Sequence, residues 1–406
     1  MQIGLKSMSN KKKNSGVYYE ILAVPEIINL LGALSSDGAE IFLVGGCVRD
    51  AVLGITSPDI DLATDAMPNE VLELCKKFQF KTLETGRSHG TITVVLDKIL
   101  FHVTTFRSDI NTDGRRAKVK FSKSYLEDSK RRDFTMNALY MTIEGKILDP
   151  LGGWNDLMSG EVRFIGKPID RIKEDYLRVL RYFRFLAQYG KKKNSIQPNV
   201  LSACAESLNG LKSLSKERIW DEIKKLLKAE NPVFALEAMK SCGVLDVVIP
   251  RAEVQNLHKL LGFEKRFNLK PDALNRLVSL SRRTVASLIL DWPISKRDRS
   301  TVEIILNISQ DNSSLRVKSY KYGKKLVLRS LLIFLDELHE GKEKEILAEV
   351  NFGSSKKFPL ATKDFIIYVE PSKRLGELMS QIKTIWLESN MSLSRKALLS
   401  QLKAIK

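Results

Sequence analysis

Cysteine is scarce in this sequence, and long apolar runs are absent from it. The four cysteines, Cys47, Cys75, Cys204 and Cys242, form no C-x-x-C pair, and their spacing matches neither a zinc site nor a disulfide framework. This usage is typical of a reduced, intracellular protein, so we expect a cytoplasmic location. No apolar run approaches the roughly 20 residues that a membrane helix needs, and we expect no membrane partner.

Acidic residues are outnumbered by basic ones. The 406 residues include 66 lysines and arginines against 48 aspartates and glutamates, which gives a formal net charge of +18. Such an excess indicates a polyanionic partner, for which RNA, DNA and a membrane surface are the candidates. The alternative is a source whose proteins are basic in general. The length indicates about two to four domains.

The hydrophobic pattern changes near Pro150. Before it, helical and strand patterns alternate: a helix from Pro25, strands at Ile41–Val44 and Asp59–Thr64, a helix at Pro68–Phe78, and a hairpin of Thr91–Leu96 with Ile99–Phe106. After it, strand signals fade and helices follow, among them a long one from Asp170 to Tyr189. We predict a disordered basic tail (1–19), an α/β head (20–150), a helical neck (151–235) and a helical body and tail (236–406).

The first notable motif is a glycine turn between a strand and a helix, Leu43-Val-Gly-Gly-Cys-Val-Arg-Asp50. Glycine lets the backbone pass close to a ligand, so Gly46 is a candidate for contact with phosphate. Arg49 adds a planar fork of hydrogen-bond donors. The alternative is a turn that merely reverses the chain.

An aspartate pair, Asp59-Ile60-Asp61, follows shortly after that turn. In a strand, residues two apart point to the same side, so both carboxylates face one way and Ile60 faces the opposite core. Two like charges on one face repel unless a cation neutralises them. A pair of Mg²⁺ ions would do so, and would activate a hydroxyl and stabilise a leaving pyrophosphate. The alternative is a solvated strand edge.

The block Arg131-Arg-Asp-Phe-Thr-Met-Asn-Ala138 places two arginines beside polar side chains that can recognise a sugar. Arg132 can grip phosphate oxygens. Asp133 can accept from a ribose hydroxyl and Asn137 can read a sugar edge, which suits a protein that must recognise ribonucleotides. A charge cluster at a helix start is the alternative.

The block from Arg171 to Arg184 is expected to lie on the long helix. Asp175 and Arg178 are three apart and thus neighbours on a helix surface, where an acceptor beside a donor fork can pair with the Watson–Crick edge of a base. Arg181 and Arg184 continue the row and are expected to reach phosphate or to position the first pair. A solvated helix with internal salt bridges is the alternative.

Together these blocks resemble the tRNA nucleotidyltransferase and bacterial poly(A) polymerase family, the class II branch of the polymerase-beta-like nucleotidyltransferases. The resemblance spans roughly residues 40 to 250. It implies an α/β nucleotidyltransferase head followed by an all-α body and tail, with tRNA, CTP and ATP as partners. It also implies that Asp59 and Asp61 bind the metal, that Gly46 and Arg49 hold the triphosphate, and that the Asp175 helix selects C or A.

Three functions remain open: CCA addition to tRNA, poly(A) synthesis, and tRNA binding without catalysis. The run Thr85-Gly-Arg-Ser-His-Gly-Thr-Ile-Thr-Val94 resembles CCA-adding members and favours the first. His102 favours the third, because relatives usually carry an acidic residue there. For CCA addition, we expect the segment Asp109–Lys123 to be a moving loop, with Gly114 as its hinge and Arg115 and Arg116 as phosphate contacts.

Overall fold

The computed structural model describes residues 19–57, 59–113, 116–191, 196–281, 292–334, 341–371 and 373–405, with the backbone alone at 109–113, 116–118 and 334. Residues 1–18 of the predicted basic tail lie outside this part of the chain. The chain divides into two compact units. One runs to Leu214 and includes Ala238–Val244, and the other consists of Ser215–Glu237 and Leu245–Lys406. The predicted four-part division of the chain stays a prediction.

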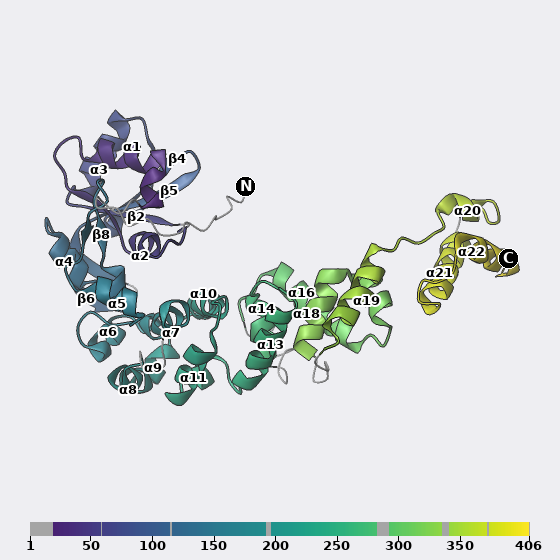
Figure 1. Ribbon diagram of the computed structural model, residues 1–406. Helices are drawn as coiled ribbons and strands as arrows, with labels where there is room; N and C mark the ends of the chain where they lie inside the picture. Colours follow the sequence, from purple (N-terminus) through teal and green to yellow (C-terminus); the bar gives the residue numbers. More distant parts are fainter. Residues whose placement is uncertain are drawn as a thin grey trace, which may run out of the picture. The chain divides into compact units, whose positions relative to one another are not determined.

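The first unit is built on a seven-stranded sheet with the order β3-β4-β5-β2-β1-β8-β9. Figure 1 labels β2, β4, β5 and β8 of this sheet. The central strand, β2, pairs antiparallel with β1 and parallel with β5. The strands are β1 (Ile41–Val44), β2 (Ile60–Thr64), β3 (Lys81–Gly86), β4 (Thr91–Leu96), β5 (Ile99–Thr105), β8 (Tyr140–Met141) and β9 (Ile147–Leu148).

Apolar stripes fix the helices of this unit against the sheet. The side chains of Ile27, Leu30 and Leu31 on α1 are buried, and α1 and α3 pack against each other and against the sheet. The helices are η1 (Glu20–Ala23), α1 (Pro25–Leu34), α2 (Gly46–Val52), α3 (Pro68–Lys77), η2 (Arg87–His89), α4 (Tyr125–Lys130), η3 (Thr135–Asn137), α5 (Gly153–Ser159), α6 (Pro168–Glu174), α7 (Leu177–Tyr189), α8 (Pro198–Glu206) and α9 (Leu208–Leu211).

The hairpin predicted from Thr91–Leu96 and Ile99–Phe106 is confirmed. Strands β4 and β5 pair antiparallel, and the turn between them has positive φ at both Asp97 (45°) and Lys98 (71°). Two successive positive φ values are what a tight two-residue hairpin turn requires. Strand β3, an exposed edge strand with charged side chains, was not predicted, because it lacks a clear apolar alternation.

The segment predicted as a moving loop is instead largely a β-hairpin. Strands β6 (Arg107–Asp113) and β7 (Arg116–Phe121) pair antiparallel as a separate two-stranded sheet. Gly114 and Arg115, the predicted hinge and one phosphate contact, lie outside the described residues. The sequence of this segment is polar, which is compatible with a two-stranded ribbon because such a ribbon needs little apolar burial.

The single helix predicted from Asp170 to Tyr189 is wrong. It is two helices, α6 and α7, separated at Asp175, whose backbone is extended (φ −155°, ψ 107°). The Asp175 carboxylate accepts a hydrogen bond from the Leu177 N–H at 3.1 Å. In a continuous helix the Leu177 N–H would bond to a backbone carbonyl one turn earlier. Here it bonds to the Asp175 side chain, so Asp175 caps the start of a new helix.

The second unit is helical throughout its described residues, and the chain has no described strand after β9. The predicted α/β head followed by helices is therefore confirmed. Two apolar clusters stabilise the second unit, one around Phe365 and Trp386 and another around Val302 and Ile333. Helices α11 (Val233–Ser241) and α12 (Val244–Val248) each belong partly to the first unit. The other helices of the second unit are α10 (Lys216–Leu227), α13 (Val254–Arg266), α14 (Ala273–Leu280), α16 (Lys296–Gln310), α17 (Leu315–Tyr322), α18 (Lys324–Phe334), α19 (Glu343–Ser355), α20 (Thr362–Ile366), α21 (Lys373–Glu388) and α22 (Arg395–Ile405).

Candidate active site

The aspartate pair lies at the start of the central strand. Asp59 precedes β2 and is exposed, whereas Asp61 is the second residue of β2 and is half-buried. Ile60 between them is buried, as the strand period predicts. Asp61 therefore faces away from Ile60, and Asp59 is near enough for its charge to act on the Asp61 carboxyl.

The electrostatics of Asp61 favour a nearby cation. Burial raises the pKa of its carboxyl above the ordinary value, and the charge of Asp59 raises that pKa further. The charges of His102 and Arg132 act in the opposite direction. A partly buried carboxylate facing a second carboxylate is destabilised when both are ionised, and a bound cation relieves this cost.

The donor set fits a divalent ion that arrives with a phosphate substrate. Within the described residues, no group of three or more histidine, cysteine, aspartate or glutamate side chains is placed to hold a metal ion. Two carboxylates alone leave most coordination positions open, and Mg²⁺ in phosphoryl-transfer sites is held in this way, by one or two carboxylates with water and phosphate oxygens.

His102 stands beside the pair on the neighbouring strand. It pairs in register with Asp61 across the parallel β2 and β5 strands, so both side chains lie on the same face. Its Nδ1 lies 3.1 Å from the Thr93 hydroxyl oxygen, which orients the ring. The imidazole of His102 is therefore next to Asp61 on the same face of the sheet.

The glycine turn allows an arginine to approach the backbone. Gly45 has φ of 75°, and a Cβ atom there would lie 3.3 Å from Nη1 of Arg132. A larger residue would be strained by this conformation and would crowd the guanidinium. Gly46 begins α2 directly after this turn. The structure thus brings Gly45 and Arg132 together, whereas a Cβ atom on Gly46 would lie 3.6 Å from Nη2 of Arg49.

Asp128 on α4 holds Arg132 in place and was not predicted as part of the site. Its side chain is fully buried, pairs with Arg132 at 2.8 Å and Arg131 at 2.7 Å, and accepts a hydrogen bond from the Tyr140 hydroxyl at 2.7 Å. Burial alone would raise the pKa of this carboxyl, but the two guanidinium charges outweigh it and lower the pKa to about 2. The spacing of Asp128 three and four residues before the arginines was the signal that could have revealed it.

Four predicted site residues form one hydrogen-bonded chain, in which all but the half-buried Arg181 are buried. Arg181 donates to Asp133 at 2.8 Å, Asn137 donates to Asp133 at 3.0 Å, and Arg49 donates to the Asn137 side-chain oxygen at 2.6 Å. Although burial raises the pKa of the Asp133 carboxyl, the Arg181 charge and these hydrogen bonds hold it well below its usual range. The chain joins α2 to α7 through the Asp133–Asn137 segment.

Three of the predicted arginines gather around one aromatic ring. The guanidinium carbons of Arg184, Arg49 and Arg181 lie 4.0, 5.1 and 5.4 Å from the centre of the Phe185 ring. Arg184 also donates to Gln188 at 3.1 Å. Cations are attracted to the face of an aromatic ring but repel one another, and the carboxylates of Asp50 and Asp133 offset part of this repulsion by pairing with Arg49 and Arg181.

The predicted base-reading pair is divided between two elements. Asp175 lies at the break before α7, and Arg178, on the first turn of α7, pairs with Glu174 and donates to the Arg171 carbonyl at 2.8 Å. Arg171 in turn donates to the carbonyls of Arg131 and Arg132, each at 2.6 Å. The arrangement ties the break between the helices to the Arg132 segment.

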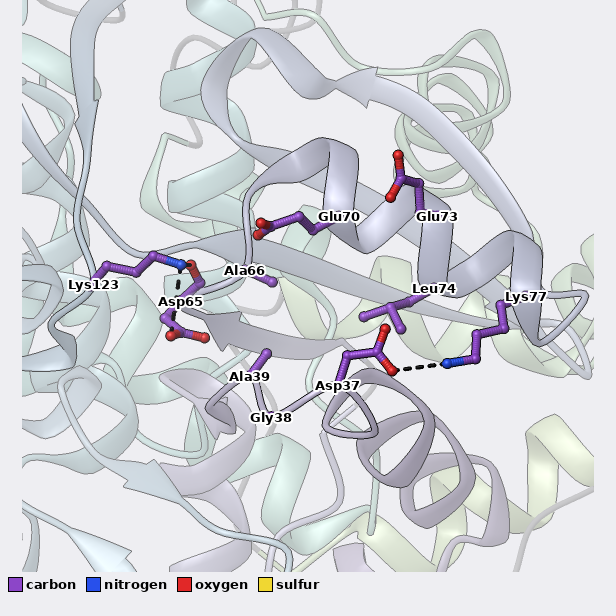
Figure 2. Close-up of a pocket in the computed structure, with 10 residues that line it drawn as sticks. All are labelled: Asp37, Gly38, Ala39, Asp65, Ala66, Glu70, Glu73, Leu74, Lys77 and Lys123. Atoms are coloured by element: carbon purple, nitrogen blue, oxygen red, sulfur yellow. Dashed lines mark hydrogen bonds and ion pairs between the residues drawn. The ribbon is translucent and has the colours of Figure 1, made fainter.

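A cavity of about 470 Å³ lies away from these residues (Figure 2). Asp65 follows the end of β2 and Ala39 precedes β1, so this cavity is at the opposite end of both strands from Gly45 and Asp61. Lys77 and Asp37, which also line it, pair at 2.9 Å. It is therefore separate from the candidate active site.

Comparison with known proteins decides the family. The description "Poly A polymerase head domain" matches residues 41–163, and "Probable RNA and SrmB- binding site of polymerase A" matches residues 195–255. The mitochondrial CCA tRNA nucleotidyltransferase 1 of Mus musculus is 30% identical over 399 residues, covering 95% of this chain and 91% of that protein. The chain belongs to the CCA-adding nucleotidyltransferase family.

Other members support this membership across most of the chain. The CCA-adding enzyme of Enterococcus faecalis is 31% identical over 401 residues, covering 92% of this chain and 94% of the relative. The solved CCA-adding enzyme of Bacillus stearothermophilus in complex with CTP shares the fold, with a TM-score of 0.70 at 23% identity over 94% of this chain and 97% of that one. Nucleotidyltransferases of this family use a divalent metal ion. Among the described residues, no helix has the length and apolar character to cross a bilayer.

Proposed function

We propose that this chain adds CCA to the 3′ end of tRNA from CTP and ATP. The observation that carries the proposal is that relatives named as CCA-adding enzymes align over more than nine-tenths of the chain. The aspartate pair, the glycine turn and the arginine cluster stand together in the first unit, as such an enzyme requires. A cytoplasmic location stays a prediction, since relatives named as mitochondrial are among the similar proteins.

In such an enzyme each site residue would bind either the metal ion or the incoming nucleotide. Asp59 and Asp61 would hold Mg²⁺, which when bound lowers the pKa of the attacking 3′-hydroxyl and stabilises the leaving pyrophosphate. Gly46 and Arg49 would hold the triphosphate. Arg132 would approach the nucleotide at the glycine turn, and Arg181 and Arg184 would supply positive charge beside it.

Ribose recognition would fall to Asp133 and Asn137. Asp133 and Asn137 are only 9% and 7% exposed, and their side chains are hydrogen-bonded to each other. A bound ribose hydroxyl would join this chain as an additional or replacement partner of the Asp133 carboxylate. Because the carboxylate is held ionised by Arg181, it accepts hydrogen bonds and does not donate them.

The product of the reaction tests the function. We expect tRNA that lacks CCA to receive three nucleotides, C, C and A, and then to stop when CTP and ATP are both supplied. A tRNA ending in CC should gain a single A from ATP alone. Sequencing of the product ends measures both results, with a tRNA already ending in CCA as the control.

The alternatives give different products. Long A tails on any RNA with ATP alone would replace CCA addition by poly(A) synthesis. Binding of tRNA without any incorporation, at every divalent ion tried, would favour the non-catalytic reading to which His102 points.

Base choice gives a second expected result. Replacing Asp175 with alanine should narrow the preference for CTP and ATP over GTP and UTP by about 1–3 kcal/mol, because one partner of the base edge is lost. The same change removes the Leu177 cap and should cost about 1 kcal/mol of stability.

Asp175→Asn separates the two effects. Its amide oxygen can keep the cap at Leu177, while its NH₂ group changes the pattern of donors and acceptors offered to a base. Single-nucleotide incorporation with each of the four triphosphates measures the ratios. If Asp175→Asn and Asp175→Ala both keep the wild-type ratios, the assignment of Asp175 to base recognition is wrong.

A further inference from the structure

Tyr189, the last residue of α7, packs its ring against Arg49 of the arginine cluster. Its ring centre lies 4.3 Å from the Arg49 guanidinium carbon, closer than the Phe185 ring at 5.1 Å. Its hydroxyl donates to the Asp50 carboxylate at 2.9 Å, and Arg49 pairs with the same carboxylate oxygen at 2.9 Å. One tyrosine therefore holds both Arg49 and the aspartate next to it.

This arrangement leaves Arg49 little freedom. Only 6% of Arg49 and 8% of Asp50 is exposed, and the guanidinium is bounded by the Tyr189 ring, the Asp50 carboxylate and the Asn137 side chain. Burial raises the pKa of the Tyr189 hydroxyl to about 12, so this group keeps its proton and remains the donor to Asp50 at neutral pH. A planar cation held on one face by a ring and along its edge by a carboxylate has a defined orientation.

The same contacts connect the two recognition elements of the site. Arg49 lies on α2, three residues after Gly46, whereas Tyr189 ends the helix whose first turn carries Arg178. Near the middle of α7, Arg181 bonds Asp133, which joins through Asn137 to Arg49. Helix α7 is thus attached to α2 at two separate points, directly through Tyr189 and indirectly through Arg181.

We infer that Tyr189 is a positioning residue that holds the Arg49 guanidinium in the orientation needed to bind the triphosphate of the incoming nucleotide. The inference rests on the proposed function, in which Arg49 grips the triphosphate. It assigns to Tyr189 a part in binding that is common to CTP and ATP, because both carry the same triphosphate. It assigns no part in the choice of base.

The experiment uses inorganic tripolyphosphate, which carries the phosphate chain without a base. Titration calorimetry with the full chain measures its affinity, and steady-state kinetics measure KM and kcat for CTP and ATP. Tyr189→Leu removes the ring and the hydroxyl, whereas Tyr189→Phe removes only the hydroxyl. Tyr182→Phe is the matched control, since Tyr182 lies on the same helix but packs its ring against Phe164.

Tyr189→Leu should weaken tripolyphosphate binding about tenfold, the order expected from loss of a desolvated cation–π contact. It should raise KM for CTP and for ATP by the same factor while kcat changes much less. Tyr189→Phe should retain most of the affinity, and Tyr182→Phe should equal the wild type. A general structural defect would instead lower the melting temperature and kcat together.

Unchanged tripolyphosphate affinity in Tyr189→Leu would overturn the inference, as would a KM increase for one nucleotide only. If Tyr189→Leu fails to fold, the calorimetric result for Tyr189→Phe decides. An affinity loss larger than that of Tyr182→Phe supports the inference, and equality of the two variants overturns it. If the proposed function is wrong, the result is a different one, because the wild-type chain itself will not add CCA to tRNA.

Discussion

The Asp61→Asn variant is expected to incorporate nucleotides at least about a thousandfold more slowly than the wild-type chain, because a lost metal ligand removes several kcal/mol of transition-state stabilisation. Asp61 lies on the central strand, and the amide keeps its shape while removing the charge. Asp59→Asn should have an effect of the same order. Single-turnover incorporation of labelled CTP into tRNA lacking CCA measures the rates.

Stability distinguishes this loss from unfolding. Burial and the Asp59 charge both raise the Asp61 pKa, so the ionised carboxylate is a cost to the metal-free fold. Its removal should leave the melting temperature unchanged or slightly higher. Asp65→Asn at the other end of the same strand is the control, and it should turn over normally (Figure 2). Substantial turnover by Asp61→Asn, with ordinary dependence on divalent ions, would remove Asp61 from the metal site.

The Asp128→Ala variant is expected to lose about 3–5 kcal/mol of folding stability. Asp128 is fully buried between two arginines and the Tyr140 hydroxyl, so its removal leaves Arg132 without its opposite charge. Because Arg132 stands 3.3 Å from the position of a Cβ on Gly45, nucleotide binding should also weaken. Urea unfolding, monitored by circular dichroism, measures the free energy.

The pH dependence of the same variant has a definite sign. The folded pKa of Asp128 is depressed to about 2, against an unfolded value of about 3.9. The ionised carboxylate therefore contributes stability that is fully present above the unfolded pKa and is lost as the pH falls through the folded one. The difference between wild type and Asp128→Ala should shrink in that window. Glu127→Ala, an exposed neighbour on α4, is the control, and an equal loss there would contradict the central role of Asp128.

Local patterns were sufficient to predict the strand that carries the aspartates and the hairpin beside it. The strand period places Asp59 and Asp61 on one face whatever the rest of the chain does, and the Asp97–Lys98 turn needs only two adjacent residues. The all-helical character after Pro150 also follows from repeated apolar stripes. These features depend on neighbours within a few positions.

The break at Asp175 and the partners of the arginines could not be predicted in the same way. Ile172 and Val179 are seven apart, so the apolar stripe reads as one helix through the break. Arg49 and Tyr189 are 140 positions apart, and nothing in the sequence near either one indicates the other. Charged groups reveal their function class by type and spacing, but their partners depend on tertiary packing.

The break between α6 and α7 also bears on how such an enzyme can diversify. Asp175 lies outside both helices, while the buried residues of α7, such as Val179 and Phe183, belong to the packed core. If Asp175 recognises the base, as proposed above, a substitution there would alter which nucleotide is accepted without removing a contact of the apolar core. Base choice and the apolar core of α7 would then depend on different side chains, so that a change of specificity costs the fold at most the Leu177 cap.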